Sequence, residues 1–241
     1  MLDRATLQDL IERAERIFLH PQPQYSWKGI IVGVAVMNPS GHRGTFAAVG
    51  QNTWRGFHKV DKERSGAAEG FRGYFLDDAV LLQRELNSVA SEQDLDCLED
   101  DVLKKVKARL INIKPGMLQS YNKIRKPLDL YFEHLVAMAS ELSTVRQRLI
   151  PLLRLPLDSQ MFQSPHLFSD SDLRGIGLSR QSTFHAVKSA DQYQKLQTIV
   201  KRRADQYGEI AGQVFYPIYF DLWWNDRYRK SGGNLFEVNL G

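Results

Sequence analysis

Four polar side chains in the stretch 168–187 carry groups that can bind a nucleic acid: Arg180, Gln181, Ser182 and His185. Arginine and glutamine make paired hydrogen bonds with base edges in the major groove of DNA, and all four side chains can reach phosphates. Because they follow a glycine turn and open a predicted helix, they would project from its first turns.

The turn before these residues contains the residue types that a steep crossing between two helices requires. Gly177 supplies a residue that can adopt unusual backbone angles, and Ile176 and Leu178 would fill the wedge between the helices. Ser179 is a good N-cap for the second helix. The segment LRGIGLSRQSTFHAV resembles the GLSR-ST-F core of bacterial helix-turn-helix regulators and recombinases, and this resemblance implies that Arg180, Gln181, Ser182 and His185 meet DNA.

A second resemblance uses two of the same residues. Arg180 and His185 satisfy the R-x4–6-H pattern and so resemble the pair found in HEPN-type ribonucleases. That resemblance implies an arginine and a histidine at a dimer interface, with the histidine acting in RNA cleavage that needs no metal ion.

Positive charge is concentrated in two segments, although the net charge is only +4. Residues 102–126 contain no acidic side chain, and residues 174–203 contain one, Asp191. Such basic patches favour a polyanion partner. The alternative is a solvated helix face, neutralised by the acidic cluster at residues 92–101. The predicted phosphate contacts are Lys188, Lys201, Arg202 and Arg203, with a second surface formed by Lys104, Lys105, Lys107, Lys123, Arg125 and Lys126.

The composition is that of an ordinary globular protein, with 43% hydrophobic and 25% charged residues in 241. No apolar run is long enough to cross a membrane, and no signal peptide is visible, so a cytoplasmic protein without a membrane partner is expected. The single cysteine, Cys97, excludes an intrachain disulfide. The scattered histidines and glycines match no metal or nucleotide motif, so we expect no metal and no cofactor. No catalytic residue is assigned, because no nucleophile motif is present.

The periodicity predicts an α+β protein that is predominantly α-helical. We expect a helix over residues 5–19, a β-hairpin over 30–54 with its first strand covered on both faces, and helices over 77–89, 92–113, 117–126, 127–150 and 190–215. Residues 151–169 are a candidate linker. The predicted regions are 1–76, 77–150 and 151–241, which could also form one continuous domain.

Aromatic side chains near the C-terminus form a stripe that should pack as core or as an oligomer interface: Phe215, Tyr219, Phe220, Trp223 and Trp224. Taken together, the sequence favours a DNA-binding protein, DNA rather than RNA, that acts as a homo-oligomer or as a subunit of a complex. The alternatives are a scaffold that uses the aromatic tail and the hairpin as interfaces, and a HEPN-like ribonuclease.

Overall fold

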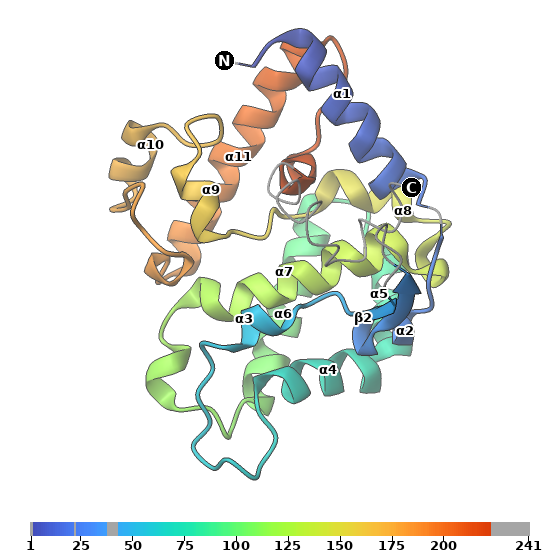
Figure 1. Ribbon diagram of the computed structural model, residues 1–241, viewed down its shortest axis with the longest axis vertical. Helices are drawn as coiled ribbons and strands as arrows, with labels where there is room; N and C mark the ends of the chain where they lie inside the picture. The colour runs from blue at the N-terminus through green and yellow to red at the C-terminus, as the bar shows by residue number, and fades with distance from the viewer. Residues whose placement is uncertain (1, 22, 38–42, 223–241) are drawn as a thin grey trace.

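Helices form most of the protein and one small antiparallel sheet completes it, so the prediction of a predominantly helical α+β fold is confirmed. The computed structural model describes residues 2–21, 23–37 and 43–222 (Figure 1). The α-helices and strands are α1 (Arg4–Ala14), α2 (Trp27–Val32), β1 (Val34–Met37), β2 (Arg43–Phe46), α3 (Gln51–Trp54), α4 (Ala67–Asp77), α5 (Ala79–Ser88), α6 (Glu92–Arg109), α7 (Tyr121–Met138), α8 (Arg146–Leu149), α9 (Ser159–Gln163), α10 (Asp170–Gly175) and α11 (Ala190–Ala211).

Short helices of other types join these elements. The chain continues from α1 into a π-helical turn, η1 (Glu15–Leu19), so the helix predicted over 5–19 is confirmed with a change of type in its last turn. The 3-10 helices are η2 (Pro115–Leu118), η3 (Ser140–Leu142), η4 (Ile150–Leu152), η5 (Phe184–Ala186) and η6 (Pro217–Phe220).

Helix α7 runs across the middle of the molecule (Figure 1). Fifteen of its 18 residues are buried, so neighbours enclose it on nearly every side. Around it pack α2, α6 and α11. Helix α4 packs against α2 and α6, and α1 packs against α11. The sequence predicts a boundary or a kink at Pro127; the boundary is wrong, because α7 continues through this residue. Packing on both sides of Pro127 offsets the one backbone hydrogen bond that a proline removes.

The buried apolar side chains form one cluster that draws on all three predicted regions, for example Phe18, Leu98 and Val200. The supposed linker 151–169 belongs to it, because Leu155, Leu157 and other residues there are buried and α9 lies within it. The linker prediction is therefore wrong: those leucines pack inward. The division into three regions stays a prediction.

The apolar run that predicts a strand over 30–37 is divided between a helix and a strand. Ser26 caps α2 by accepting a hydrogen bond from the Gly29 backbone N–H (3.1 Å). Gly33 ends α2 with φ of 124°, a backbone angle that glycine adopts readily, and turns the chain into β1. In the short hairpin, Val34 pairs with Phe46.

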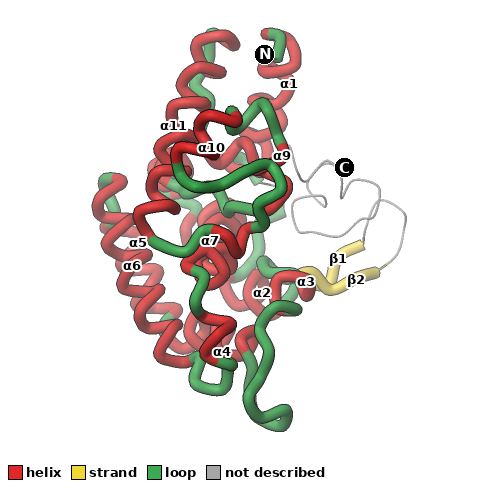
Figure 2. Tube along the Cα trace, turned by 90° about the vertical axis from the view of Figure 1, so that its left-hand side faces the viewer, coloured by secondary structure: helices red, strands yellow, loops and turns green. Residues whose placement is uncertain are grey.

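The hairpin projects from the helical body (Figure 2). Ala35 is exposed, so the expectation of a strand covered on both faces is wrong. The second strand forms as β2, but the last residues of the predicted hairpin, 51–54, form α3 instead. The sequence did not predict helix α4. This helix buries four residues at helical spacing: Ala67, Phe71, Tyr74 and Phe75.

The described part of the aromatic stripe is core. Phe215, Tyr219 and Phe220 are buried, and the Tyr219 ring stacks on that of Phe18 with centroids 6.0 Å apart. Trp223 and Trp224 lie outside the described residues.

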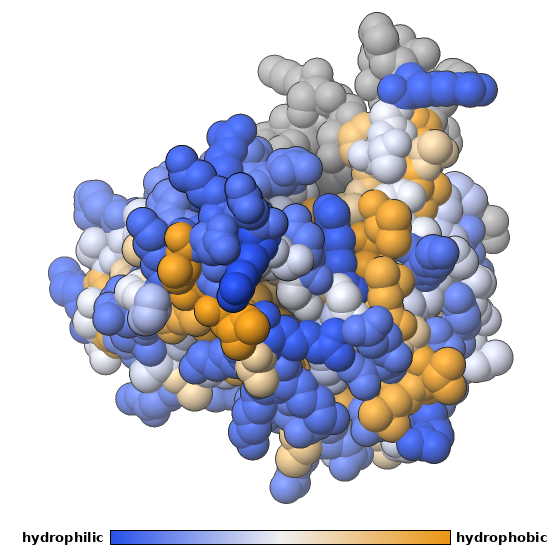
Figure 3. Space-filling view, turned by 90° about the horizontal axis from the view of Figure 1, so that it is seen from below, coloured by the Kyte–Doolittle hydropathy of each residue, from blue (hydrophilic) through white to orange (hydrophobic). Residues whose placement is uncertain are grey.

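Several large apolar side chains are exposed on the surface. They include Val80 of α5 and three residues in loops, Val60, Ile111 and Val214. On the face shown in Figure 3 apolar residues occur in several patches among hydrophilic ones. Exposure of this kind is ordinary for a protein surface, so the predicted homo-oligomer or complex stays a prediction.

A buried polar network joins α6, α7 and α11, and Arg125 lies at its centre. The Arg125 guanidinium donates to Glu99 and, at 2.6 Å, to Asp129 Oδ1. The Tyr193 hydroxyl donates to Asp129 Oδ2 (2.9 Å), and the Tyr193 ring lies 4.9 Å from the guanidinium. All four side chains are buried, so their contacts with one another replace contacts with water, except that Glu99 Oε1 has no hydrogen-bond partner in the described structure.

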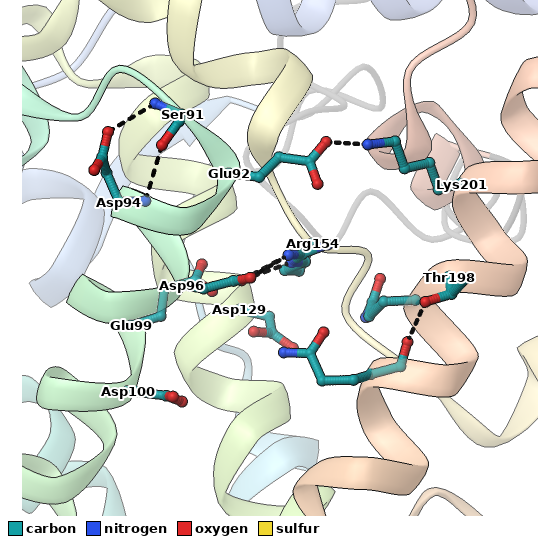
Figure 4. Close-up of polar contacts among 12 residues, drawn as sticks. Ser91, Glu92, Asp94, Asp96, Glu99, Asp100, Asp129, Arg154, Thr198 and Lys201 are labelled. Carbon is teal, nitrogen blue, oxygen red and sulfur yellow. Dashed lines mark hydrogen bonds and ion pairs between the residues drawn. The ribbon is translucent and has the colours of Figure 1, made fainter.

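Further ion pairs extend this network toward the surface (Figure 4). Arg154 binds the Asp96 carboxylate through two nitrogens, at 3.0 and 2.6 Å. Lys201 of α11 pairs with Glu92 of α6. Because the paired groups come from different elements, they fix how α11 and the chain after η4 lie against α6.

The central arginine is shared by two buried carboxyl groups, and the exposed Asp100 carboxylate lies 3.8 Å from it. Burial raises the pKa of Asp129 to about 7, although Arg125 opposes the shift. Burial also raises the pKa of Glu99. One cation therefore offsets only part of the cost of burying the two carboxylates.

We expect Arg125→Met to lower the free energy of unfolding by about 3–5 kcal/mol, because Glu99 and Asp129 would remain buried without their cation. Urea unfolding measures the change. Lys105→Met is the control: Lys105 pairs with Asp101 (2.6 Å) on an exposed face of α6, where a pair contributes about 0.5 kcal/mol or less. Equal losses in the two variants would contradict the central position of Arg125.

The Asp129 carboxyl also predicts a pH dependence of stability. Its pKa is about 7 in the folded chain against 3.8 ordinarily, so between these values the folded state holds more protons. The contribution of this group to the stability of the folded state is therefore present below about pH 4 and is lost as the pH rises through about 7. We expect Asp129→Asn to reduce the fall in the free energy of unfolding as the pH rises, measured by urea unfolding at several pH values. Asp205→Asn, at an exposed position, should leave this pH dependence unchanged. A wild-type decline that persists in Asp129→Asn would assign it to other groups.

Candidate anion-binding site

The predicted second helix of the helix-turn-helix is not formed. Helix α10 and the glycine turn are present, and Gly177 has φ of 76°. After that turn, however, the chain makes a further turn near Arg180 and then the 3-10 helix η5. The next α-helix begins only at Ala190, with Ser189 as its N-cap. The expectation that Arg180, Gln181, Ser182 and His185 project from one helix is therefore wrong.

Distant side chains explain the local conformation. The Phe184 backbone N–H donates to Ser159 Oγ (2.9 Å). The Val187 carbonyl accepts from the Ser120 hydroxyl (3.1 Å) and from the Asn122 backbone N–H (3.3 Å). These backbone groups are satisfied outside their own segment, so an α-helix over 180–187 has no advantage.

Arg180 has a structural position. Its guanidinium pairs with Asp170 (2.6 Å) and donates to the carbonyl oxygens of Phe168 (2.9 Å) and Phe162 (3.3 Å). Gln181 is exposed. The Ser182 hydroxyl accepts from the Ser179 backbone N–H (2.9 Å). Arg180 thus joins the α9 and α10 segments.

A hollow of about 310 Å³ lies beside the N-terminal end of α7, and we call it the basic hollow. Three segments meet there: the loop after α3, the stretch from η2 into α7, and the stretch from η5 to α11. No lining residue is acidic, and the volume is at the low end for small-molecule sites, roughly 300–1,000 Å³. The lining residues are Gly56, His58, Gly116, Met117, Gln119, Ser120, Lys123, His185 and Lys188.

The hollow brings together three of the predicted cationic side chains, with a fourth close by. Lys123, His185 and Lys188 line it. Lys126 adds positive charge that acts on His185, although it pairs with Asp158. The sequence predicted all four as DNA contacts, but it placed them on two separate surfaces.

Lys123 is held in place by the loop after α3. Its ammonium donates to the Gly56 carbonyl and lies 4.8 Å from the centre of the Phe57 ring. A side chain at position 56 would begin 3.3 Å from Lys123 Cε and 3.5 Å from His185 Cε1, so the glycine permits this close approach. Burial lowers the pKa of Lys123.

The electrostatics of the hollow favour an anion. Burial lowers the pKa of His185, and repulsion from Lys123, Lys188 and Lys126 lowers it further. The positive end of the α7 dipole adds to this potential. Ser120, the N-cap of α7, does not cap the helix with its side chain, because its hydroxyl donates to Val187 instead.

The other predicted cations lie elsewhere. Arg125 is 1% exposed and cannot reach an external ligand. Lys201 pairs with Glu92, and Arg202 pairs with Asp172 at 2.7 Å. Arg203 donates to Gln206 Oε1 at 2.9 Å. Lys104, Lys105 and Lys107 are exposed on α6 and do not line the hollow.

His58 was missed as a candidate residue. It lies in a basic loop, residues 55–66, to which the sequence prediction assigns no role. The loop is held against residues 112–114: the Lys114 backbone N–H donates to the His58 carbonyl (3.0 Å) and the Val60 N–H to that of Asn112 (2.8 Å). The basic character of the loop was the available signal, but its neighbours follow only from the fold.

The HEPN-like pair is not assembled within the chain. Arg180 turns toward Asp170 and the α9 segment, whereas His185 lines the basic hollow. His185 instead shares its hollow with His58 and Lys123.

A larger hollow of about 390 Å³ lies between α5 and α6, and its lining includes Glu85, Asp94, Cys97 and Asp101. Asp94 accepts hydrogen bonds from backbone N–H groups before α6, and Asp101 pairs with Lys105. Two of these carboxylates already stabilise α6, so the basic hollow is the stronger candidate for a binding site.

Over the described ranges, no group of three or more His, Cys, Asp or Glu side chains is arranged to hold a metal ion. In the same part of the chain, no helix is both long and apolar enough to span a membrane. Comparison with known proteins finds no matching family model, no matching curated protein and no matching solved structure.

We expect Lys188→Ala to raise the pKa of His185, because one of the repelling charges is removed while burial is unchanged. Titration of the imidazole signals by NMR measures it. Lys195→Ala is the matched control, since Lys195 lies on α11 and pairs with Asp191 (2.8 Å). An unchanged His185 titration in Lys188→Ala would show that the two groups do not share the hollow.

Proposed function

We propose that the protein binds nucleic acid through phosphate groups, with the basic hollow as the contact site. The observation that supports this proposal is the convergence of Lys123, Lys188 and two histidines on one hollow that no acidic residue lines. These side chains come from segments more than 60 residues apart in the chain, so the fold itself assembles the charge.

Like charges are placed where they repel one another. Lys123 lies in the first turn of α7, at the positive end of the helix dipole, where a carboxylate would be stabilising and a cation is not. A bound phosphate would relieve this repulsion and would accept hydrogen bonds from the ammonium groups. The arrangement therefore costs stability in the free protein and favours anion binding.

Contacts to phosphate replace the base contacts expected of a recognition helix. Arg180 is engaged within the fold, so its reading of a DNA base loses support. Lys188 and His185 are exposed or half-buried at the hollow, and Lys123, although buried, lines it. Phosphate contacts fix the position of a nucleic acid without reading its sequence. The proposal thus covers DNA, which the sequence favours, and RNA.

The test is binding of labelled single-stranded DNA and RNA, and of duplex DNA, followed by fluorescence anisotropy at several salt concentrations. If Lys123 and Lys188 each neutralise one phosphate, the slope of log affinity against log salt for a single strand should be about −1.4, at about 0.7 per contact. Lys188→Glu should weaken binding about tenfold, or 1.4 kcal/mol.

Lys107→Glu is the matched control, because it makes the same change of charge on the exposed surface of α6. It should leave the affinity nearly unchanged. A larger loss in Lys107→Glu than in Lys188→Glu would move the binding surface to α6, and a flat salt response would remove the phosphate contacts altogether.

A further inference from the structure

We infer that the basic hollow cleaves single-stranded RNA without a metal ion, with His185 as general base and His58 as general acid. This inference rests on the proposed function, since the same hollow must first bind the phosphate. Its own support is the presence of two histidines and Lys123 around one volume of about 310 Å³.

The two histidines reach the hollow from different segments. His58 is exposed in the loop after α3, two residues beyond Gly56. His185 lies in η5, and its Cε1 comes within 3.5 Å of the position that a Cβ at residue 56 would take. A phosphodiester in the hollow would therefore have an imidazole from each segment beside it.

The surroundings of His185 suit a base. The ring packs on Phe184 with centroids 4.0 Å apart and is half-buried. Burial and the neighbouring lysines lower its pKa, so the imidazole is neutral at neutral pH and can accept a proton. By contrast, burial lowers the pKa of His134 to about 4, and its Nδ1 contacts the Leu130 carbonyl inside the core, away from any substrate.

The reaction balances without a further reactant. His185 takes the proton of a ribose 2′-hydroxyl as O2′ attacks the adjacent phosphorus. The P–O5′ bond breaks, and His58, acting as the general acid, gives a proton to the leaving O5′. The products are a 2′,3′-cyclic phosphate and a 5′-hydroxyl end, and exchange with water restores both histidines.

Lys123 and Lys188 would stabilise the transition state. Negative charge on the non-bridging oxygens increases as the fifth bond to phosphorus forms, and fixed ammonium groups nearby favour that state. Lys123 is positioned for this by its bond to the Gly56 carbonyl. Because the nucleophile is the 2′-hydroxyl, the inference restricts the substrate to RNA.

The experiment compares an RNA oligonucleotide carrying a fluorophore and a quencher with its DNA and 2′-O-methyl counterparts, in the presence of a chelator. We expect cleavage of the RNA alone, with cyclic phosphate ends identified by mass spectrometry. His58→Ala and His185→Ala should each lower the cleavage rate about 100-fold or more. Both should still bind the 2′-O-methyl oligonucleotide, which reports binding without cleavage.

The pH profile adds a readout that a structural role would not change. Lys188→Ala should move the acidic limb of the rate profile upward, along with the pKa of His185. Binding of the 2′-O-methyl oligonucleotide without cleavage of the RNA would overturn the inference and leave the proposed function standing. Cleavage that both histidine variants retain at the wild-type rate would overturn it equally. Absence of binding would remove the proposed function itself.

Discussion

The fold depends on one buried arginine that must satisfy two carboxyl groups. Arg125 holds Glu99 of α6 and Asp129 of its own helix, and Tyr193 of α11 completes the contact. Three helices are therefore fixed by groups that could not stay buried apart from one another. Apolar packing supplies most of the driving force for folding, but it is less directional than these bonds. The network sets how α6, α7 and α11 are placed around the core.

The same helix carries the candidate site. In the first two turns of α7, Arg125 points into the network, while Lys123 faces the basic hollow. Just before and within that turn, Ser120 and Asn122 hold the backbone at residue 187. The position of α7 thus determines where His185 and Lys188 lie. The placement of α7 therefore accounts both for the buried polar network and for the positive charges gathered at the N-terminal end of this helix.

Much of the fold follows from sequence patterns that act locally. The spacing of apolar residues predicts the helix that begins at Arg4 and the long helix that begins at Ala190, and the turn at Gly177 follows from its residue type. The predictions are wrong where groups distant in the sequence determine the local conformation. Ser159 and Asn122 satisfy the backbone near Phe184, so a segment with a good N-cap does not become a helix. Of the candidate site, charge alone indicated Lys123 and Lys188. Only the fold brings His58 beside His185.

The six histidines of the chain offer a direct test of the central claim, that the basic hollow is where a phosphate ligand binds. NMR can follow their imidazole signals while a single-stranded 2′-O-methyl oligonucleotide is added. The account predicts that the signals of His58 and His185 shift together and saturate, while the buried His134 stays unchanged. Saturable binding that leaves both His58 and His185 unperturbed would contradict it.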